Sequence, residues 1–291
     1  MGSQMSEDSG DSPESWPAVE PGPLAMIATD IDGTMLRTDG SLSPRVKAAM
    51  AEAVSAGIHV VPTTGRPVLV AQDIIEASEL SDYWIFANGA ITRHLGRDEL
   101  IRGFWMERNL TKRLVAKVRE ALPEAGFAVE FEKTVAFERG FADLVGSVPD
   151  VALADDVLEM VDSDHPDYER IQKILVFDQA AEIDDLFAAV GAAAGSDAVP
   201  SYSGLAFIEL AASTVTKATA LELLCEDLNI DRSQAATFGD NYNDLSMLEW
   251  AGRSYAMANA IDEAKRVASQ TVLSSDDDGL AVKIEELLAE L

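Results

Sequence analysis

Short apolar runs alternate along this chain with segments whose apolar residues recur at helical spacing. The run from Leu24 to Thr29 follows Pro23 and is short and continuous, which favours a buried strand over a helix. Apolar residues then recur at helical spacing over residues 44–57, and residues 58–62 form the next apolar run. A strand, a helix and a second strand of these lengths predict a parallel crossover unit. A third apolar run, residues 83–87, predicts another strand.

The pattern changes at about Ile91, where strands come in hairpin pairs, and crossover units resume only after about Leu205. Such pairs indicate an α+β insert in an α/β protein, whose parallel sheet is covered by helices on both faces. The insert is expected to hold hairpins over 91–106 and 127–139, helices over 109–122 and 182–194, and a strand over 170–178. After it we expect strands over 205–211, 235–238, 254–257 and 271–273, with helices over 213–228 and at the chain end. We therefore divide the chain into a tail (1–23), a catalytic core (24–90 and 207–291) and an inserted domain (91–206).

Composition narrows the class of protein. Residues 1–23 are rich in Ser, Pro, Gly, Asp and Glu without Lys or Arg, which predicts a disordered tail. The formal net charge of −29 argues against nucleic acids and anionic membrane surfaces as partners, because binding them requires Lys and Arg. Cys225 is the only cysteine, so no internal disulfide can form and a cytoplasmic location is expected. No uncharged apolar run approaches the ~18 residues of a membrane span.

Two carboxylates, Asp30 and Asp32, follow the first predicted strand directly, and Gly33 lets the backbone turn there. The carboxyl end of a strand is where open α/β sheets bind their ligands. Like charges this close require a cation or a shared proton, so the pair predicts a metal site. A calcium loop is excluded because its sixth and twelfth positions would be Met35 and Ser41 instead of Gly and Glu. A plain acidic turn remains the alternative for this segment taken alone.

Further polar residues follow other predicted strands at what we expect to be the same sheet edge. Thr64 and Arg66 come after the second strand, with the alternative of a threonine helix cap beside a solvated arginine. Lys217 lies in the first turn of a helix, where a cation opposes the helix dipole. Asp240 and Asp244 follow another strand. An oxygen-only donor set of this kind predicts Mg2+ rather than zinc, and phosphoryl transfer as the chemistry.

The same segments resemble the four motifs of the haloacid dehalogenase superfamily. They are DIDGT at residues 30–34, TTGR at 63–66, the lysine of STVTKATAL at 213–221, and GDNYNDLSML at 239–248. Their order, with the insert between the second and third motifs, resembles the Cof-type branch that carries a type IIB cap. The resemblance implies a Rossmann-like parallel core with an inserted α+β cap domain. Thr63 and Ala218 depart from the residues common in the family, at positions that are not catalytic.

Residue by residue, the resemblance implies that Asp30 is the nucleophile that becomes an aspartyl phosphate. Asp32 would act as the acid for the leaving oxygen and then as the base for water. Thr64 and Lys217 would hold the phosphoryl group. Magnesium would be bound by Asp30, the backbone carbonyl of Asp32, and Asp240. The supporting residues would be Gly33, Thr34, Gly65, Arg66, Asn243 and Asp244.

The expected function is Mg2+-dependent hydrolysis of small phosphate monoesters, with sugar phosphates and related metabolites as the first candidates. The insert begins and ends beside motif-bearing strands. It should therefore cover the sheet edge at which the motifs lie, which we call the catalytic edge, and exclude large substrates. Small residues at 88–90 and 203–205 would serve as its hinges. The alternatives are a phosphomutase of the same superfamily and a catalytically inactive phosphate- or metal-binding module. The oligomeric state stays open.

Overall fold

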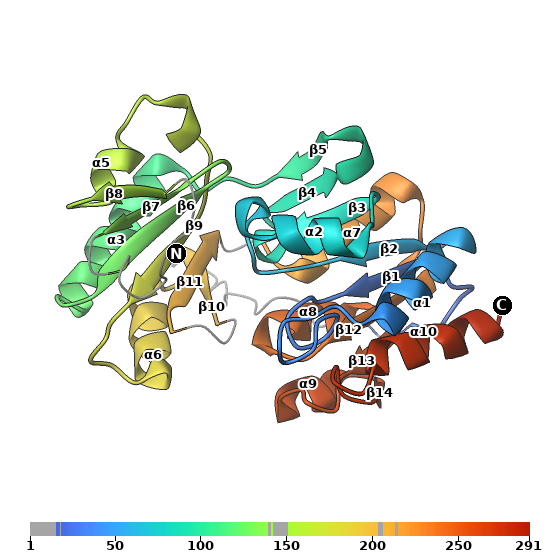
Figure 1. Ribbon diagram of the computed structural model, residues 1–291. Helices are drawn as coiled ribbons and strands as arrows, with labels where there is room; N and C mark the ends of the chain where they lie inside the picture. The colour runs from blue at the N-terminus through green and yellow to red at the C-terminus, as the bar shows by residue number, and fades with distance from the viewer. Residues whose placement is uncertain (1–15, 18, 139–140, 142–150, 203–205, 213–214) are drawn as a thin grey trace, which may run out of the picture.

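The computed structural model describes residues 16–17, 19–138, 141, 151–202, 206–212 and 215–291. Figure 1 shows two lobes, one around a parallel sheet and the other around a mainly antiparallel sheet. We call them the core lobe, whose strands lie within residues 26–103 and 235–271, and the cap lobe, whose strands lie within residues 126–212. The predicted fold class, an α/β parallel sheet with an α+β insertion, is confirmed.

The core lobe is built on a five-stranded parallel sheet. Its strands are β1 (Met26–Thr29), β2 (His59–Pro62), β12 (Ala235–Gly239), β13 (Arg253–Ala256) and β14 (Gln270–Thr271). Their order is β14-β13-β12-β1-β2, and every neighbouring pair is parallel. Because β1 lies between β2 and β12, the carboxyl ends of these three strands meet at one edge of the sheet.

Helices cover both faces of this sheet (Figure 1). The helices of the core lobe are α1 (Pro44–Ser55), α2 (Gln72–Ser78), α7 (Lys217–Leu228), α8 (Leu245–Trp250), α9 (Asp262–Val267) and α10 (Gly279–Ala289). Ile27 of β1 packs in a cluster with α1, α2, α9 and α10, whereas Met26 and Ala28 pack against α7 and α8. Successive side chains of a strand point to opposite faces, and here both faces are buried. The run is therefore apolar at every position.

The start of α1 shows how the local sequence sets an element boundary. Ser43 caps the helix, because its Oγ accepts a hydrogen bond from the backbone N–H of Val46 at 3.1 Å. Pro44 takes the first helical position, where its missing N–H costs no hydrogen bond. Gly57, with φ of +84°, turns the chain after the helix toward β2. The helix predicted over residues 44–57 is thus confirmed.

The first predicted hairpin is present, but it extends the core lobe. Strands β3 (Tyr83–Phe86), β4 (Ile91–His94) and β5 (Glu99–Gly103) form an antiparallel sheet in that order. A parallel bridge between Thr63 and Ile85 joins β3 to the end of β2. Ile91 and Trp105 pack in the same apolar cluster as Ile27. The sequence predicts this hairpin but not the sheet that it joins, because a strand edge pairs through backbone groups that every residue has.

The cap lobe contains a six-stranded sheet in the order β10-β11-β9-β6-β7-β8. Its strands are β6 (Gly126–Phe131), β7 (Val135–Glu138), β8 (Val151–Ala154), β9 (Ile171–Phe177), β10 (Ala198–Ser201) and β11 (Ile208–Ala212). Helices α3 (Arg108–Ala121) and α6 (Ile183–Ala194) pack on one face, and α5 (Leu158–Val161) lies beside α3. The hairpin, the strand and the two helices predicted for this part of the insert are confirmed.

One predicted strand lies in the other sheet. We expected residues 205–211 to resume the parallel core, but β11 pairs antiparallel with β9 and β10 of the cap lobe. That expectation was wrong, because an apolar run does not reveal which sheet it joins. Lys217 therefore reaches the catalytic edge from the start of α7 and not from the end of a core strand.

Two further expectations concern the connections. Of the predicted tail, Trp16 lies beside Arg232, and the backbone N–H of Gly22 donates to the carbonyl of Ser233 at 2.9 Å. The described part of the tail thus contacts the core lobe. The predicted hinge at 88–90 overlaps the short turn Ala87–Gly89, in which Ala87 and Asn88 both have positive φ. The second predicted hinge, 203–205, lies outside the described residues.

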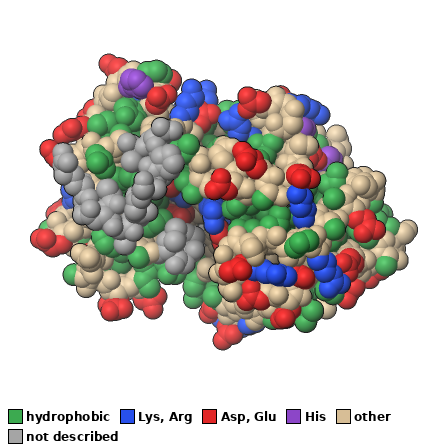
Figure 2. Space-filling view, viewed as in Figure 1, with side chains coloured by type: hydrophobic (Ala, Val, Ile, Leu, Met, Phe, Trp, Pro, Cys, Tyr) green, Lys and Arg blue, Asp and Glu red, His purple; other side chains and the backbone are tan. Residues whose placement is uncertain are grey.

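The surface carries acidic side chains over both lobes, as the composition predicts (Figure 2). Within the described ranges, no helix is both long enough and apolar enough to cross a membrane.

Leu221 tests the packing of α7 against the core sheet. Its side chain is fully buried in the cluster that also contains Met26 and Ala28. Leu221→Ala should lower the free energy of unfolding by about 2–5 kcal/mol, the usual cost of removing a buried leucine side chain. Leu273→Ala is the matched control, because Leu273 is 52% exposed. Urea denaturation of both variants measures the difference, and equal destabilisation would contradict the assigned burial.

Candidate active site

Asp30 stands at the carboxyl end of β1, in the middle of the catalytic edge. Its backbone N–H donates to the carbonyl of Phe238 at 2.9 Å, which continues the pairing of β1 with β12 by one residue. The side chain is 5% exposed. Its Oδ1 accepts a short hydrogen bond from Nζ of Lys217. The strand ladder therefore fixes Asp30 in front of Lys217.

Lys217 is the first residue of α7, and its side chain is fully buried. Thr216 caps this helix in a reciprocal pair with Thr219. Nζ of Lys217 also donates to Oδ1 of Asp244 at 2.6 Å. Burial alone would lower the pKa of Lys217, but the charges of Asp244 and Asp30 outweigh it and raise that pKa above its usual value. The lysine is thus charged and paired, which explains a cation in the first turn of a helix.

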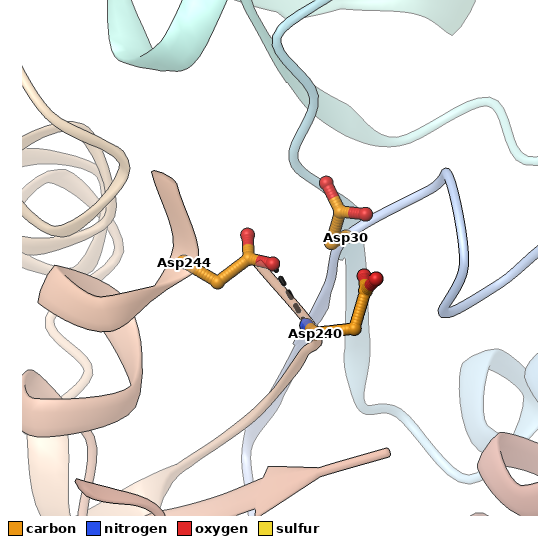
Figure 3. A group of neighbouring side chains, drawn as sticks. All are labelled: Asp30, Asp240 and Asp244. Atoms are coloured by element: carbon orange, nitrogen blue, oxygen red, sulfur yellow. Dashed lines mark hydrogen bonds between the residues drawn. The ribbon is translucent and has the colours of Figure 1, made fainter. Parts of the chain in front are cut away.

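The loop after β12 holds Asp240 and Asp244 in a tight arrangement (Figure 3). Oδ2 of Asp244 accepts hydrogen bonds from the backbone N–H groups of Asp240 at 2.8 Å and Asn241 at 3.0 Å. A Cβ on Gly239 would lie 2.5 Å from Cβ of Asp244, so only glycine fits at that position. The turn therefore requires glycine at the end of β12, where Asp244 packs against it.

The first and fourth motifs contact each other through Asp240. Oδ1 of Asp240 accepts a hydrogen bond from Oγ1 of Thr34 at 2.9 Å. Gly33 has φ of +83°, and a Cβ there would lie 2.5 Å from Oδ2 of Asp240. Nδ2 of Asn259, a residue that the sequence did not single out, donates to the carbonyl of Gly33 at 2.8 Å. These contacts hold the turn after Asp32 against the loop of Asp240.

Asp30, Asp240 and Asp244 form an acidic group whose nearest oxygens all lie within 4.8 Å of one another (Figure 3). Burial, followed by the charge of Asp244, raises the pKa of Asp30 well above its usual range, although Lys217 opposes the shift. Burial and the charge of Asp244 raise the pKa of Asp240 to about 7. One lysine cannot neutralise three carboxylates. The surplus negative charge and the oxygen-only donors fit a hard divalent cation.

Asp32 lies outside this acidic group and faces Arg66. Nε and Nη2 of Arg66 donate to the two carboxylate oxygens of Asp32 at 2.8 and 2.5 Å. The Asp32 side chain is 49% exposed, whereas Thr64 is buried. Oγ1 of Thr64 accepts a hydrogen bond from the backbone N–H of Arg66 at 3.0 Å. The second motif thus lies beside the first, with its arginine paired to Asp32 instead of solvated.

Residues of the cap lobe reach this edge, although sequence reasoning did not single them out. Nδ2 of Asn243 donates to Oδ1 of Asn88 at 3.0 Å, and Nδ2 of Asn88 donates to Oε2 of Glu209 at 2.7 Å. Glu209 in turn pairs with Lys173, which also pairs with Glu130. One signal could have revealed the last three residues: each is a charged residue inside a mainly apolar strand.

A cavity of about 510 Å³ opens between the lobes beside this edge. Lys217 and Asn243 line it from the core lobe, and Phe187, Val199 and Tyr202 line it from the cap lobe. Both lobes thus contribute walls to a space large enough for a small organic molecule.

The sequence profile of the haloacid dehalogenase-like hydrolases matches residues 27–284, which is most of the chain. The chain belongs to this family. The hydrolase is 27% identical to the phosphatase YwpJ of Bacillus subtilis over 304 residues, covering 91% of this chain and all of that protein. It is 26% identical to the 5-amino-6-(5-phospho-D-ribitylamino)uracil phosphatase YitU of the same organism, over 90% of this chain and 96% of that one. The predicted family and enzyme class are confirmed.

Solved structures show the same fold. A haloacid dehalogenase-like hydrolase from B. subtilis superposes with a TM-score of 0.79 at 24% identity, over 90% of this chain and 99% of that one. A sugar phosphatase of subclass IIB of the superfamily superposes with a TM-score of 0.75 at 18% identity, over 90% and 98%. The hydrolase therefore shares its fold with these proteins over 90% of the chain.

The raised pKa of Asp240 predicts how the stability of the metal-free hydrolase depends on pH. In the folded protein this pKa is about 7, and in an unfolded chain it is about 4. The folded state therefore binds the proton more tightly, and the free energy of unfolding should fall as pH rises from about 4 to about 7. Asp240→Asn should remove this fall in the free energy of unfolding. In EDTA the variant should melt above the wild type at pH 8, with a smaller advantage at pH 5.

Scanning calorimetry at both pH values checks this expectation. Asp164→Asn, a change at an exposed aspartate of the cap lobe, is the control and should show no such difference. An advantage of Asp240→Asn that is as large at pH 5 as at pH 8 would contradict the electrostatic account.

Proposed function

We propose that the hydrolase is a phosphatase that requires a divalent metal and cleaves small phosphate monoesters through a phosphorylated Asp30. The observation that carries this proposal is the position of Asp30. It is a nearly buried carboxylate at the end of a parallel strand, held by Lys217 within an acidic group. Phosphoryl transfer needs an aligned nucleophile and positive charge around the transferred group; Asp30 fits the first need, and Lys217 together with a bound divalent cation would meet the second.

Asp30 is the nucleophile in this proposal. Lys217 binds its Oδ1, and among the described residues no hydrogen bond engages its Oδ2. That oxygen forms the bond to phosphorus as the ester oxygen leaves. Water then attacks the aspartyl phosphate, which releases inorganic phosphate and restores the carboxylate. Lys217 favours the charged form of Asp30 against the burial and the Asp244 charge that raise its pKa, and a bound divalent cation would favour that form further.

The bound metal would be held by Asp30 and Asp240, with the backbone carbonyl of Asp32 as a further ligand. Asp244 is less available, since its Oδ1 binds Lys217 and its Oδ2 accepts two backbone hydrogen bonds. We infer that Asp244 orients Lys217 and the loop of Asp240. When bound, Mg2+ would offset the negative charge that gathers as a phosphate dianion meets carboxylates.

Asp32 is the proposed general acid and base. Arg66 holds its carboxylate at the more exposed side of the site, where a leaving oxygen or an incoming water could reach it. Thr64 lies on the adjacent loop, and we assign its hydroxyl to the transferred phosphoryl group.

The substrates we propose are small soluble metabolites. The cavity beside Lys217 and Asn243 is bounded by both lobes, so a bulky ester would have to separate them. One relative is named for a ribitylaminouracil phosphate, and one structural neighbour is a sugar phosphatase. We therefore propose sugar phosphates and related phosphorylated metabolites as the first candidates. A phosphate-release screen over such esters, with Mg2+ present, tests the proposal, and no turnover of any ester would refute it.

Substitutions of the two aspartates separate their roles. Asp30→Asn is nearly isosteric and should keep the fold, but turnover should vanish because an amide does not form the acyl phosphate. Asp32→Asn should lose about 10²–10⁴-fold in kcat, the usual contribution of general acid–base catalysis. Steady-state phosphate release measures both, with circular dichroism as the check on folding. A folded Asp30→Asn protein with wild-type turnover would refute the mechanism through a phosphorylated Asp30.

Metal exchange provides a second test. Activity should be lost in EDTA, return with Mg2+, and be suppressed by Ca2+. Calcium takes more oxygen ligands at longer distances, so it could engage both oxygens of Asp30 and leave none for attack. Rates of phosphate release in each metal decide the matter. Full activity in EDTA, or equal rates in Ca2+ and Mg2+, would exclude the proposed ligand set.

A further inference from the structure

The cap lobe contains a buried charged cluster on the strands nearest the catalytic edge. Lys173 of β9 lies opposite Glu130 of β6 in the sheet register, and Glu209 comes from β11 on the other side. Nζ of Lys173 lies 3.3 Å from a carboxylate oxygen of Glu130 and 3.2 Å from one of Glu209. All three side chains are almost completely buried. Such a cluster is costly to bury, so its position calls for an explanation.

Lys173 also contacts the core lobe. Its Nζ donates a hydrogen bond of 2.9 Å to the backbone carbonyl of Gly65, in the loop that carries Thr64 and Arg66. This is a charge-assisted bond from an almost fully buried ammonium, so it is stronger than an ordinary surface contact. A side chain of the cap lobe is thus hydrogen-bonded to the second motif, residues 63–66.

The three carbonyls of this loop show what Lys173 contributes. The carbonyl of Thr64 accepts from the backbone N–H of Asn88, and that of Arg66 accepts from the N–H of Ala87, at 2.9 and 3.0 Å. Both of these donors belong to the turn after β3. The carbonyl between them, that of Gly65, is bound by Lys173. The cap lobe thus supplies the middle one of three consecutive bonds that hold the loop.

Glu209, another residue of this cluster, is connected to the same loop through Asn88. Glu209 accepts a hydrogen bond from Nδ2 of Asn88, whose Oδ1 accepts from Asn243. A Cβ on Gly65 would lie 3.1 Å from Oδ1 of Asn88, so the loop packs closely on this amide. Glu130 and Glu209 together raise the pKa of Lys173, against the effect of burial. Lys173 therefore stays a charged donor.

We propose that Lys173 is a positioning residue for the reaction: through the Gly65 carbonyl it holds the loop that presents Thr64 to the phosphoryl group. The role in catalysis rests on the proposed function. The mechanical part, that Lys173 orders the loop, stands on the contacts alone. Glu130 and Glu209 keep the Lys173 ammonium charged and oriented toward the Gly65 carbonyl. They act on the loop through Lys173.

Hydrogen exchange tests the mechanical part without any substrate. The amides to follow are those of Thr64, Arg66, Ala87 and Asn88, all of which are hydrogen-bonded within or against the loop. Lys173→Met should speed their exchange about tenfold or more, the scale expected for a lost hydrogen bond to a charged group. Because this change strands two buried carboxylates, the double variant Lys173→Met/Glu130→Gln is measured beside it.

The matched control is Lys117→Met, in the exposed pair of Lys117 with Asp197 on the cap lobe. It should leave exchange in the loop unchanged. Exchange at these four amides that stays at the wild-type rate in the folded double variant would overturn the proposal, whatever its melting temperature. A lysine that only stabilises the cap sheet would lower the melting temperature without this local change.

Kinetics test the catalytic part. With an ester that the wild type hydrolyses, the folded double variant should lose about 10–100-fold in kcat, because small displacements of a binding group are costly. Lys117→Met should keep wild-type kinetics. A kcat within about twofold of wild type would refute the positioning role. If the wild type itself hydrolyses no ester, the proposed function fails, and the exchange data still decide whether Lys173 orders the loop.

Discussion

The buried ion pairs of Lys217 with Asp30 and Asp244 are the constraint on which the rest of the active site depends. An ammonium without solvent exposure is tolerated only when carboxylates compensate its charge. That requirement joins the start of α7 to the ends of β1 and β12, which lie far apart in the sequence. Asp244 serves twice, since its other oxygen also holds the turn that presents Asp240. The geometry of the site follows from neutralising one buried lysine.

Charge is distributed very differently on the surface and in the site. The chain carries a formal net charge of −29, and acidic side chains lie over both lobes (Figure 2). A phosphate ester would be repelled by that field unless positive charge were concentrated locally. Lys217 and Arg66 provide such charge at the catalytic edge, and the acidic group provides a place for a cation. Lys173 adds a third cation, which is almost fully buried, where the cap lobe meets the second motif.

Much of the core could be predicted from the sequence, because its determinants are local. The apolar run before Asp30, the cap and proline that begin α1, and the glycines at positions 33 and 239 act over a few residues. Parallel strands bring their carboxyl ends together, so the sequence also predicted that Asp30 and Asp240 would be neighbours. The position of Lys217 in a first helical turn, where a cation opposes the helix dipole, is explained by the two carboxylates that the structure places beside it.

Only the tertiary structure decided which strands pair and which charges meet. The hairpin β4–β5 joins the core lobe and β11 joins the cap sheet, because strand pairing uses backbone groups that are alike in every sequence. The partner of Asp32, which is Arg66, depends on how two loops from different strands face each other. Lys173 reaches Gly65 only because the cap sheet folds over the catalytic edge. The sequence alone thus determined which residues we propose for the chemistry, and long-range packing decided what holds them in place.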